Sequence, residues 1–150
     1  MKQLLSIFVA TMFLFACNSN SNEAAIPTEN VSHEHHDSVV LTLNNGEKWK
    51  ADSTTNQNVV NLKTIGDNFR IKPFPTVGEY QLLSSDLSNS LNTMIQECKM
   101  TGPDHEALHH WLEPILKDTK ELKNVNDTAT ARSIFISLDK QIDLYHSYFE

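Results

Sequence analysis

Residues 77–99 contain an apolar stripe whose spacing strongly limits the structures that they can form. Leu83, Leu87 and Leu91 follow one another every four residues, and the stripe continues through Met94, Ile95 and Cys98. Residues at this spacing share one face of an α-helix, whereas a half-buried strand needs alternation at every second residue. The stripe therefore predicts an amphipathic helix whose apolar face is buried against other elements.

Three further segments have the same helical period. We predict helices over residues 54–68, 103–123 and 128–148, with Asp52 or Ser53 capping the first. Their predicted core positions are Val59, Leu62, Ile65, Gly66 and Phe69, then His105, Leu108, His109, Leu112, Ile115, Leu116 and Leu122, and finally Ile134, Leu138, Ile142, Tyr145 and Phe149. Pro114 lies inside the third segment, where proline kinks or splits helices. Four amphipathic helices with short connections predict a mainly α, up-down-up-down four-helix bundle.

A β-hairpin is predicted before the first helix. Apolar residues alternate with polar ones on both sides of Asn44-Asn45-Gly46, over residues 39–43 and 47–51. Asn-Gly suits a two-residue hairpin turn because both central positions need positive φ. An isolated hairpin is only marginally stable in water. We therefore expect Trp49 to dock the hairpin onto the bundle.

The first residues of the chain have the composition of a secretory signal. Lys2 supplies a positive charge, residues 4–16 are apolar or small, and residues 18–22 are polar. Leu14-Phe15-Ala16-Cys17 resembles the lipobox of bacterial lipoproteins. The resemblance implies cleavage before Cys17, acyl chains on that cysteine, and attachment to a membrane of the cell envelope. It slightly favours the outer membrane, because Asn18 is not the acidic residue linked to inner-membrane retention. Composition alone leaves open an ordinary signal peptide with a chance cysteine.

Three parts of the chain are predicted on this basis: a signal peptide over residues 1–16, a His-containing tether without regular structure over residues 17–37, and one domain over residues 38–150. Loss of the first part would leave 134 of the 150 residues. It would also change the formal charge from −7 to −8, because Lys2 is the only charged residue removed. So acidic a chain is not expected to bind nucleic acid, which requires a basic surface.

Antiparallel packing brings metal-favouring side chains to one end of the predicted bundle. The second helix ends where the third begins, and the fourth ends at the same level. The residues expected at this end are Cys98, Met100, His105, His109 and His146. His105 and His109 are four residues apart, so their Cβ atoms are expected about 6 Å apart on one helix face.

These side chains predict a metal site. Thiolate, thioether and imidazole together form a ligand set for copper(I) and, less specifically, for Zn²⁺. We expect copper before zinc, with Cys98, His105 and His109 as principal ligands and Met100 as an auxiliary one, while the histidines of residues 33–36 supply the ion. Each group also has a structural interpretation: a buried inert thiol, hydrogen-bonded histidines, and a solvated polar segment.

Two other cofactors fit the sequence less well. Glu106 with His109 matches the Glu-x-x-His spacing of di-iron bundles, and Asp143 with His146 imitates it. The first helix, however, offers only Asp67, at the wrong end. The predicted bundle resembles b-type four-helix cytochromes in helix count and length only. Its first helix lacks a methionine to serve as a haem ligand, and no Cys-x-x-Cys-His sequence is present for covalent attachment.

No enzymatic signature is present in the sequence, because nothing in it places a nucleophile beside a base. We therefore expect a binding protein rather than an enzyme. The alternative to metal binding is a metal-free interaction module that docks an envelope protein through this end of the bundle or through the hairpin edge. A less favoured alternative is a bundle that binds haem non-covalently, with His146 as a ligand on the fourth helix.

Overall fold

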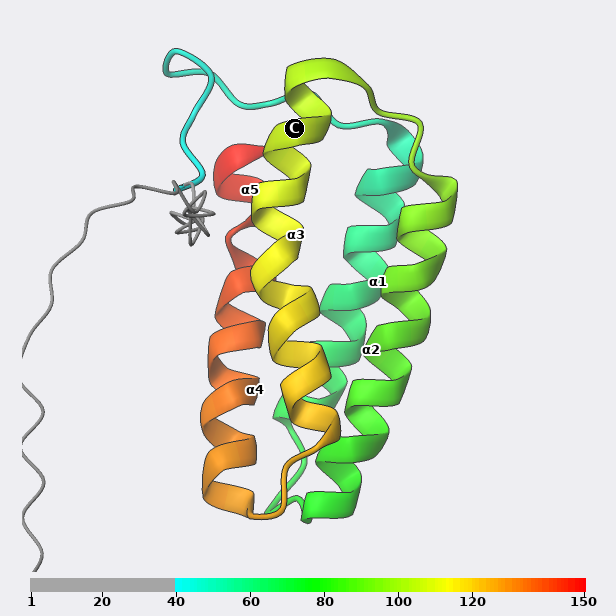
Figure 1. The fold of residues 1–150 in the computed structure, drawn as a ribbon, viewed down its shortest axis with the longest axis vertical. Helices are drawn as coiled ribbons and strands as arrows, with labels where there is room; N and C mark the ends of the chain where they lie inside the picture. The colour runs from blue at the N-terminus through cyan, green and yellow to red at the C-terminus, as the bar shows by residue number, and fades with distance from the viewer. Residues whose placement is uncertain (1–39) are drawn as a thin grey trace, which may run out of the picture. The chain divides into compact units, whose positions relative to one another are not determined.

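Helices account for most of residues 40–150, the part of the chain that the computed structural model describes. They are α1 (Ser53–Arg70), α2 (Val77–Glu97), α3 (Gly102–Lys123), α4 (Thr128–Asp143) and the short α5 (Tyr145–Tyr148). Figure 1 shows the four long helices side by side, each running opposite to the one before it. The predicted four-helix bundle is thus confirmed. Within this range no helix combines the length and the low polarity needed to cross a membrane.

The two ends of the bundle serve as reference points for the rest of the description. The upper pole contains residues 98–105 and 145–150, and the lower pole contains residues 71–76 and 124–132. The predicted signal peptide, Cys17, the tether and its histidines lie outside the described residues.

The core is formed by all four long helices and contains most of the predicted stripe positions, although Ile95 on α2 is 49% exposed. Leu62, Leu87, Ile115 and Leu138, one from each helix, are fully buried. Aromatic rings fill both ends: Phe69, Tyr80 and Phe135 pack together near the lower pole, while Trp111, Tyr145 and Phe149 pack near the upper pole. Burial of apolar surface of this kind is the main source of the free energy that stabilises packed amphipathic helices.

The core face of α3 differs from the prediction. Trp111 lies fully buried on this face, whereas His109 and Leu116 are exposed and His105 is half-buried. The large indole ring packs at the interface with α4, where its Nε1 donates a hydrogen bond to the carbonyl oxygen of Gln141 at 2.9 Å. The buried face of α3 is therefore rotated toward Trp111 relative to the predicted face, and His105 and His109 lie at the edge of the buried face. The helix continues through Pro114 without a break.

The predicted β-hairpin is not present, because no strand forms within residues 40–150. The tight turn itself does form: Asn45 and Gly46 have φ of 52° and 93°, and Asn44 and Glu47 exchange two backbone hydrogen bonds. Pairing stops there because the backbone after the turn bonds to the end of the chain instead. Trp49 donates to the carbonyl oxygen of Tyr148 at 2.8 Å and accepts from the N–H of Glu150 at 3.0 Å.

Asp52 joins the start of α1 to the connection between α2 and α3. One carboxylate oxygen accepts from the N–H of Thr55 at 2.6 Å, which caps α1 as predicted, and the other accepts from the N–H of Lys99 at 2.9 Å. Partial burial by itself would raise the pKa of Asp52, but the hydrogen bonds from Thr55 and Lys99 outweigh it and lower this pKa. Hydrogen bonding to the charged carboxylate therefore stabilises the fold.

Asp52→Ala is expected to lower the free energy of unfolding by about 1–2 kcal/mol, because it removes the helix cap and the bond to Lys99. A lowered folded-state pKa means that this stabilisation is present above about pH 4 and is lost as the pH falls further. Urea unfolding of the variant should therefore show a weaker dependence on acidic pH. Asp86→Ala, on the exposed face of α2, is the matched control, and an equal loss in both variants would contradict the assigned role.

Candidate metal-binding site

A sharp reversal of the chain brings the end of α2 and the start of α3 together at the upper pole. Cys98 is the C-terminal cap residue of α2, and Thr101 precedes α3 in an extended conformation. Gly102 has φ of +67°, a conformation that glycine adopts without steric cost, and Pro103 follows within the first turn. This reversal places Cys98 and His105 on neighbouring helix ends.

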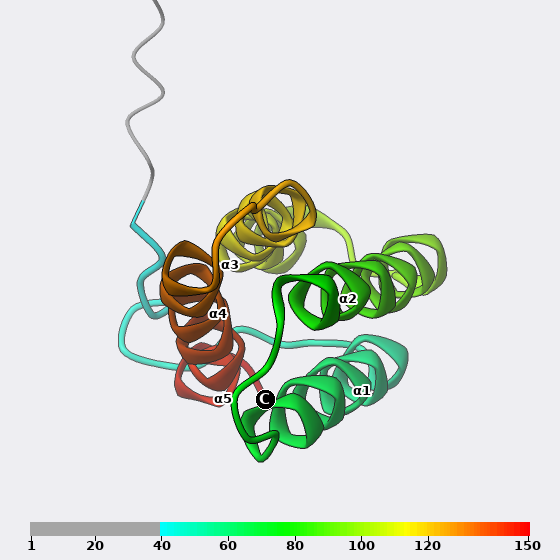
Figure 2. The same ribbon diagram turned by 90° about the horizontal axis from the view of Figure 1, so that it is seen from below.

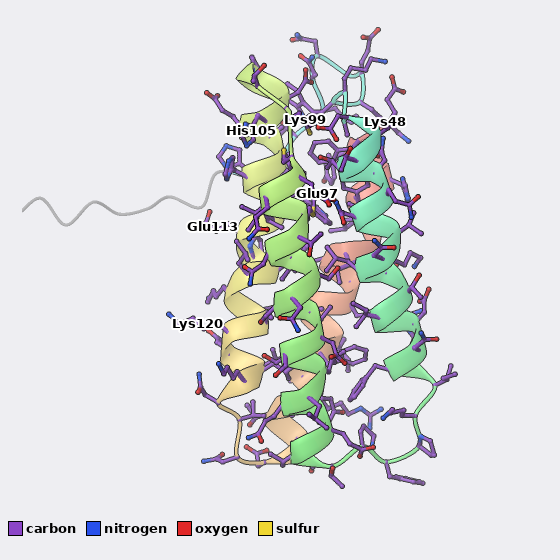
Figure 3. All side chains as sticks on the ribbon, turned by 90° about the vertical axis from the view of Figure 1, so that its right-hand side faces the viewer. Lys48, Glu97, Lys99, His105, Glu113 and Lys120 are labelled. Atoms are coloured by element: carbon purple, nitrogen blue, oxygen red, sulfur yellow. The ribbon has the colours of Figure 1, made fainter. Side chains whose placement is uncertain are left out.

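His105 and His109 form a close pair on α3. Their Nε2 atoms lie 2.9 Å apart, so one imidazole donates a hydrogen bond that the other accepts. The ring centroids are 4.6 Å apart and the ring planes differ by 23°. Figure 3 shows His105 near the upper pole, on the side of α3 that faces away from α1. Both side chains reach solvent, because His105 is half-buried and His109 is exposed.

The pair borders a pocket of about 220 Å³ between α2 and α3. Its other lining residues are Cys98, Met94, Ile95, Leu108 and Leu112. Cys98 is a half-buried free thiol, and Met94 lies one helical turn before it on the same face. Two sulfur-bearing side chains and two imidazoles therefore line one small, mainly apolar pocket. Met94 is 1% exposed and belongs to the hydrophobic core, as its position in the stripe predicts, so only the edge of this side chain borders the pocket.

The two remaining predicted ligands lie elsewhere. Met100 is 8% exposed and packs into the hydrophobic core, and it does not line the pocket. His146 is exposed on α5, where its ring centroid lies 5.3 Å from that of Tyr145. The structure thus brings together three of the five predicted residues: Cys98, His105 and His109.

Three protein ligands do not converge on one point in this part of the chain. Within residues 40–150, no group of three or more His, Cys, Asp or Glu side chains is placed to hold a metal ion. Two carboxylates near the histidines have other partners: Asp143, considered above for a di-iron site, pairs with Lys63, and Glu97 at the end of α2 accepts a hydrogen bond from Asn58 at 2.9 Å. What the described residues offer is a two-histidine pair beside a thiol and a thioether.

The two nitrogens are close enough to bind one ion. They share a hydrogen bond at 2.9 Å, which a bound metal would replace, and rotation of the side chains would place each nitrogen about 2.0–2.1 Å from the ion. Histidines at i and i+4 bind both Cu²⁺ and Zn²⁺, so the spacing alone does not select the metal. The pocket is also smaller than the roughly 300–1,000 Å³ of small-molecule sites, so it fits an ion better than haem.

Tyr145 lies near this region but is not a suitable metal ligand. Burial raises its pKa well above the ordinary value, and the negative charge of Asp52 raises it further. Its hydroxyl donates a hydrogen bond to the side-chain oxygen of Asn56 at 2.9 Å. The phenol therefore stays protonated at neutral pH, and a protonated phenol is a poor ligand.

Comparison with protein-family models, with curated proteins and with solved structures finds no match to this chain. We therefore base its function on the chemistry of its own residues. At the upper pole, that chemistry is the His105–His109 pair.

Proposed function

We propose that this chain is a lipid-anchored protein of the bacterial cell envelope that binds one copper ion through His105 and His109. The observation that carries the proposal is the 2.9 Å separation of the two Nε2 atoms. Two imidazoles four residues apart on one helix chelate an ion without any rearrangement of the backbone.

The anchor is proposed from the sequence before the bundle. Leu14-Phe15-Ala16-Cys17 follows an apolar segment that begins with a positive charge, and this order suits processing at Cys17. Acyl chains on Cys17 would hold the domain at a membrane, with the outer membrane slightly favoured. Two or more acyl chains give stable attachment, whereas one chain gives only reversible binding.

Copper is favoured over zinc because nitrogen sites bind Cu²⁺ more tightly than Zn²⁺ in the general order of divalent metals. For an ion delivered as Cu⁺, the sulfur of the half-buried Cys98 in the same pocket would be a suitable soft donor.

The proposed role is binding and transfer of copper rather than catalysis. Two protein ligands leave coordination positions open, and a donor or acceptor protein can enter such positions during exchange. In this proposal, the histidines of residues 33–36 deliver the ion to the pair. Because protons compete with the metal for imidazole nitrogen, we expect copper affinity to weaken on acidification.

A copper titration of residues 18–150 tests this function. His33, His35 and His36 are first replaced with alanine, so that the tether contributes no imidazole. We expect one Cu²⁺ per chain by competition with a chromophoric chelator, and weaker binding of Zn²⁺. A chain that binds no copper once these three histidines are removed would contradict the proposal.

The alternative of a metal-free interaction module gives a different result in the same sample. A ligand that binds only the folded state must raise its thermal midpoint, so copper is expected to stabilise the bundle. A midpoint that is unchanged by copper and by chelator would favour the alternative instead.

A further inference from the structure

The lower pole presents an aromatic side chain that the fold does not bury. Residues 71–76 connect α1 to α2, and Figure 2 shows this connection crossing the lower end of the bundle. Phe74 is 97% exposed and Ile71 is 81% exposed. Both are large apolar residues at the tip of a connection, where they contribute no core packing.

The backbone at Phe74 is strained. Its φ is +51°, in the left-handed region that a bulky residue rarely adopts, and Pro73 and Pro75 hold it on either side. Strain of this kind costs free energy and is concentrated at functional sites. Here it positions a side chain that has no role in the core.

Two adjoining pockets of about 390 and 470 Å³ lie beside Phe74. Both are bordered by Phe74, Pro75, Tyr80 and Arg132, and we call the two together the lower hollow. Its lining includes three basic residues, Arg70, Lys72 and Arg132, and no acidic one. Two of these three are paired with carboxylates outside the lining, those of Asp139 and Glu79, so the ability of the hollow to bind an anion depends on the third.

Arg132 differs from the other two basic residues. Arg70 binds Asp139 with two hydrogen bonds at 2.7 and 2.8 Å, and Lys72 pairs with Glu79 at 3.3 Å. The exposed side chain of Arg132 forms no hydrogen bond or ion pair with any other residue of the range 40–150. An unpaired guanidinium is well suited to bind a carboxylate with two parallel hydrogen bonds.

We propose that the lower hollow docks an acidic segment of a partner protein, with a carboxylate on Arg132 and an apolar side chain against Phe74. A peptide fits better than a membrane surface, because the site is concave and carries only one unpaired positive charge. Aromatic and arginine residues are also the types that dominate binding energy in protein interfaces. This docking site is independent of copper, since it lies at the opposite pole.

Short fluorescent peptides test the proposal by anisotropy with residues 18–150. One peptide alternates Glu with Leu, and its partner alternates Gln with Leu at the same length. We expect the Glu peptide to bind more tightly, and Arg132→Glu to weaken its binding by about tenfold or more. Phe74→Ala should weaken both peptides, because it removes the apolar contact.

Matched control variants distinguish binding at this site from a general effect of protein charge or exposed apolar surface on peptide binding. Lys48→Glu makes the same charge change on an exposed residue near the upper pole, and Leu82→Ala removes another exposed apolar side chain. Both should retain peptide binding. The proposal is overturned if neither peptide binds, or if Arg132→Glu and Lys48→Glu act alike. Binding of phosphatidylglycerol vesicles without peptide binding would also overturn it, since the surface would then recognise a membrane.

Discussion

Trp111→Ala is expected to lower the free energy of unfolding by about 3–5 kcal/mol, the range for truncating a large buried aromatic side chain. Trp111 is 0% exposed, and its ring packs edge-on against Tyr145 at a centroid distance of 4.9 Å. It also joins α3 to α4 through reciprocal hydrogen bonds with Gln141 at 2.9 and 3.1 Å. Domains of this size are only marginally stable, so urea unfolding should show a much lower midpoint.

Two further variants, one at Trp111 itself and one at the preceding residue, are the controls for this prediction. Trp111→Phe keeps a buried ring but loses the Nε1 donor, so it should cost less than the alanine variant. His110→Ala changes the preceding residue, which is only half-buried and not part of the core, and should change stability by about 0.5 kcal/mol or less. A loss below about 1 kcal/mol for Trp111→Ala would mean that this tryptophan does not hold the α3–α4 interface.

His105→Ala and His109→Ala are each expected to weaken copper binding by about 10²–10⁴-fold, because either change turns a chelating pair into a single imidazole. The two nitrogens lie 2.9 Å apart on one rigid helix, so the second bond forms at high effective concentration. The double variant should bind little more weakly than either single one, since the histidines act as a unit. Competition titration of the chain without tether histidines measures these affinities.

The other predicted ligands provide the controls for this experiment. His110→Ala, His146→Ala and Met100→Leu should each change copper affinity by only about twofold, because none of these residues lines the pocket of the pair. His110 is the closest match, since it is an adjacent histidine on the same helix. Equal losses from His109→Ala and His110→Ala would show that copper binds α3 without using the pair.

Most of the bundle was predictable from the spacing of apolar residues. Leu83, Leu87 and Leu91 are buried as their period predicts, and the cap at Asp52 forms as expected. A burial pattern that repeats every three to four residues is local information, so sequence alone reveals it. The prediction of a β-hairpin was wrong because the segment after the turn forms its hydrogen bonds with the end of the chain, about 100 residues later. Such pairing depends on tertiary structure.

The candidate sites were less predictable than the fold. The i, i+4 spacing of His105 and His109 indicated a pair on one face, and the structure places their nitrogens 2.9 Å apart. Sequence alone did not show that Met100 turns into the core after α2 ends at Glu97. The lower hollow left no local signal, because Phe74 and Arg132 belong to segments far apart in the chain.

Anomalous X-ray diffraction at the copper edge, on copper-soaked crystals of residues 18–150, tests the central claim most directly. The account predicts one strong peak within about 2.0–2.2 Å of both Nε2 atoms, those of His105 and His109. The experiment requires no substitution in the bundle, so altered folding cannot confuse the result. A peak at His146 or at the tether histidines, with none between His105 and His109, would contradict the claim.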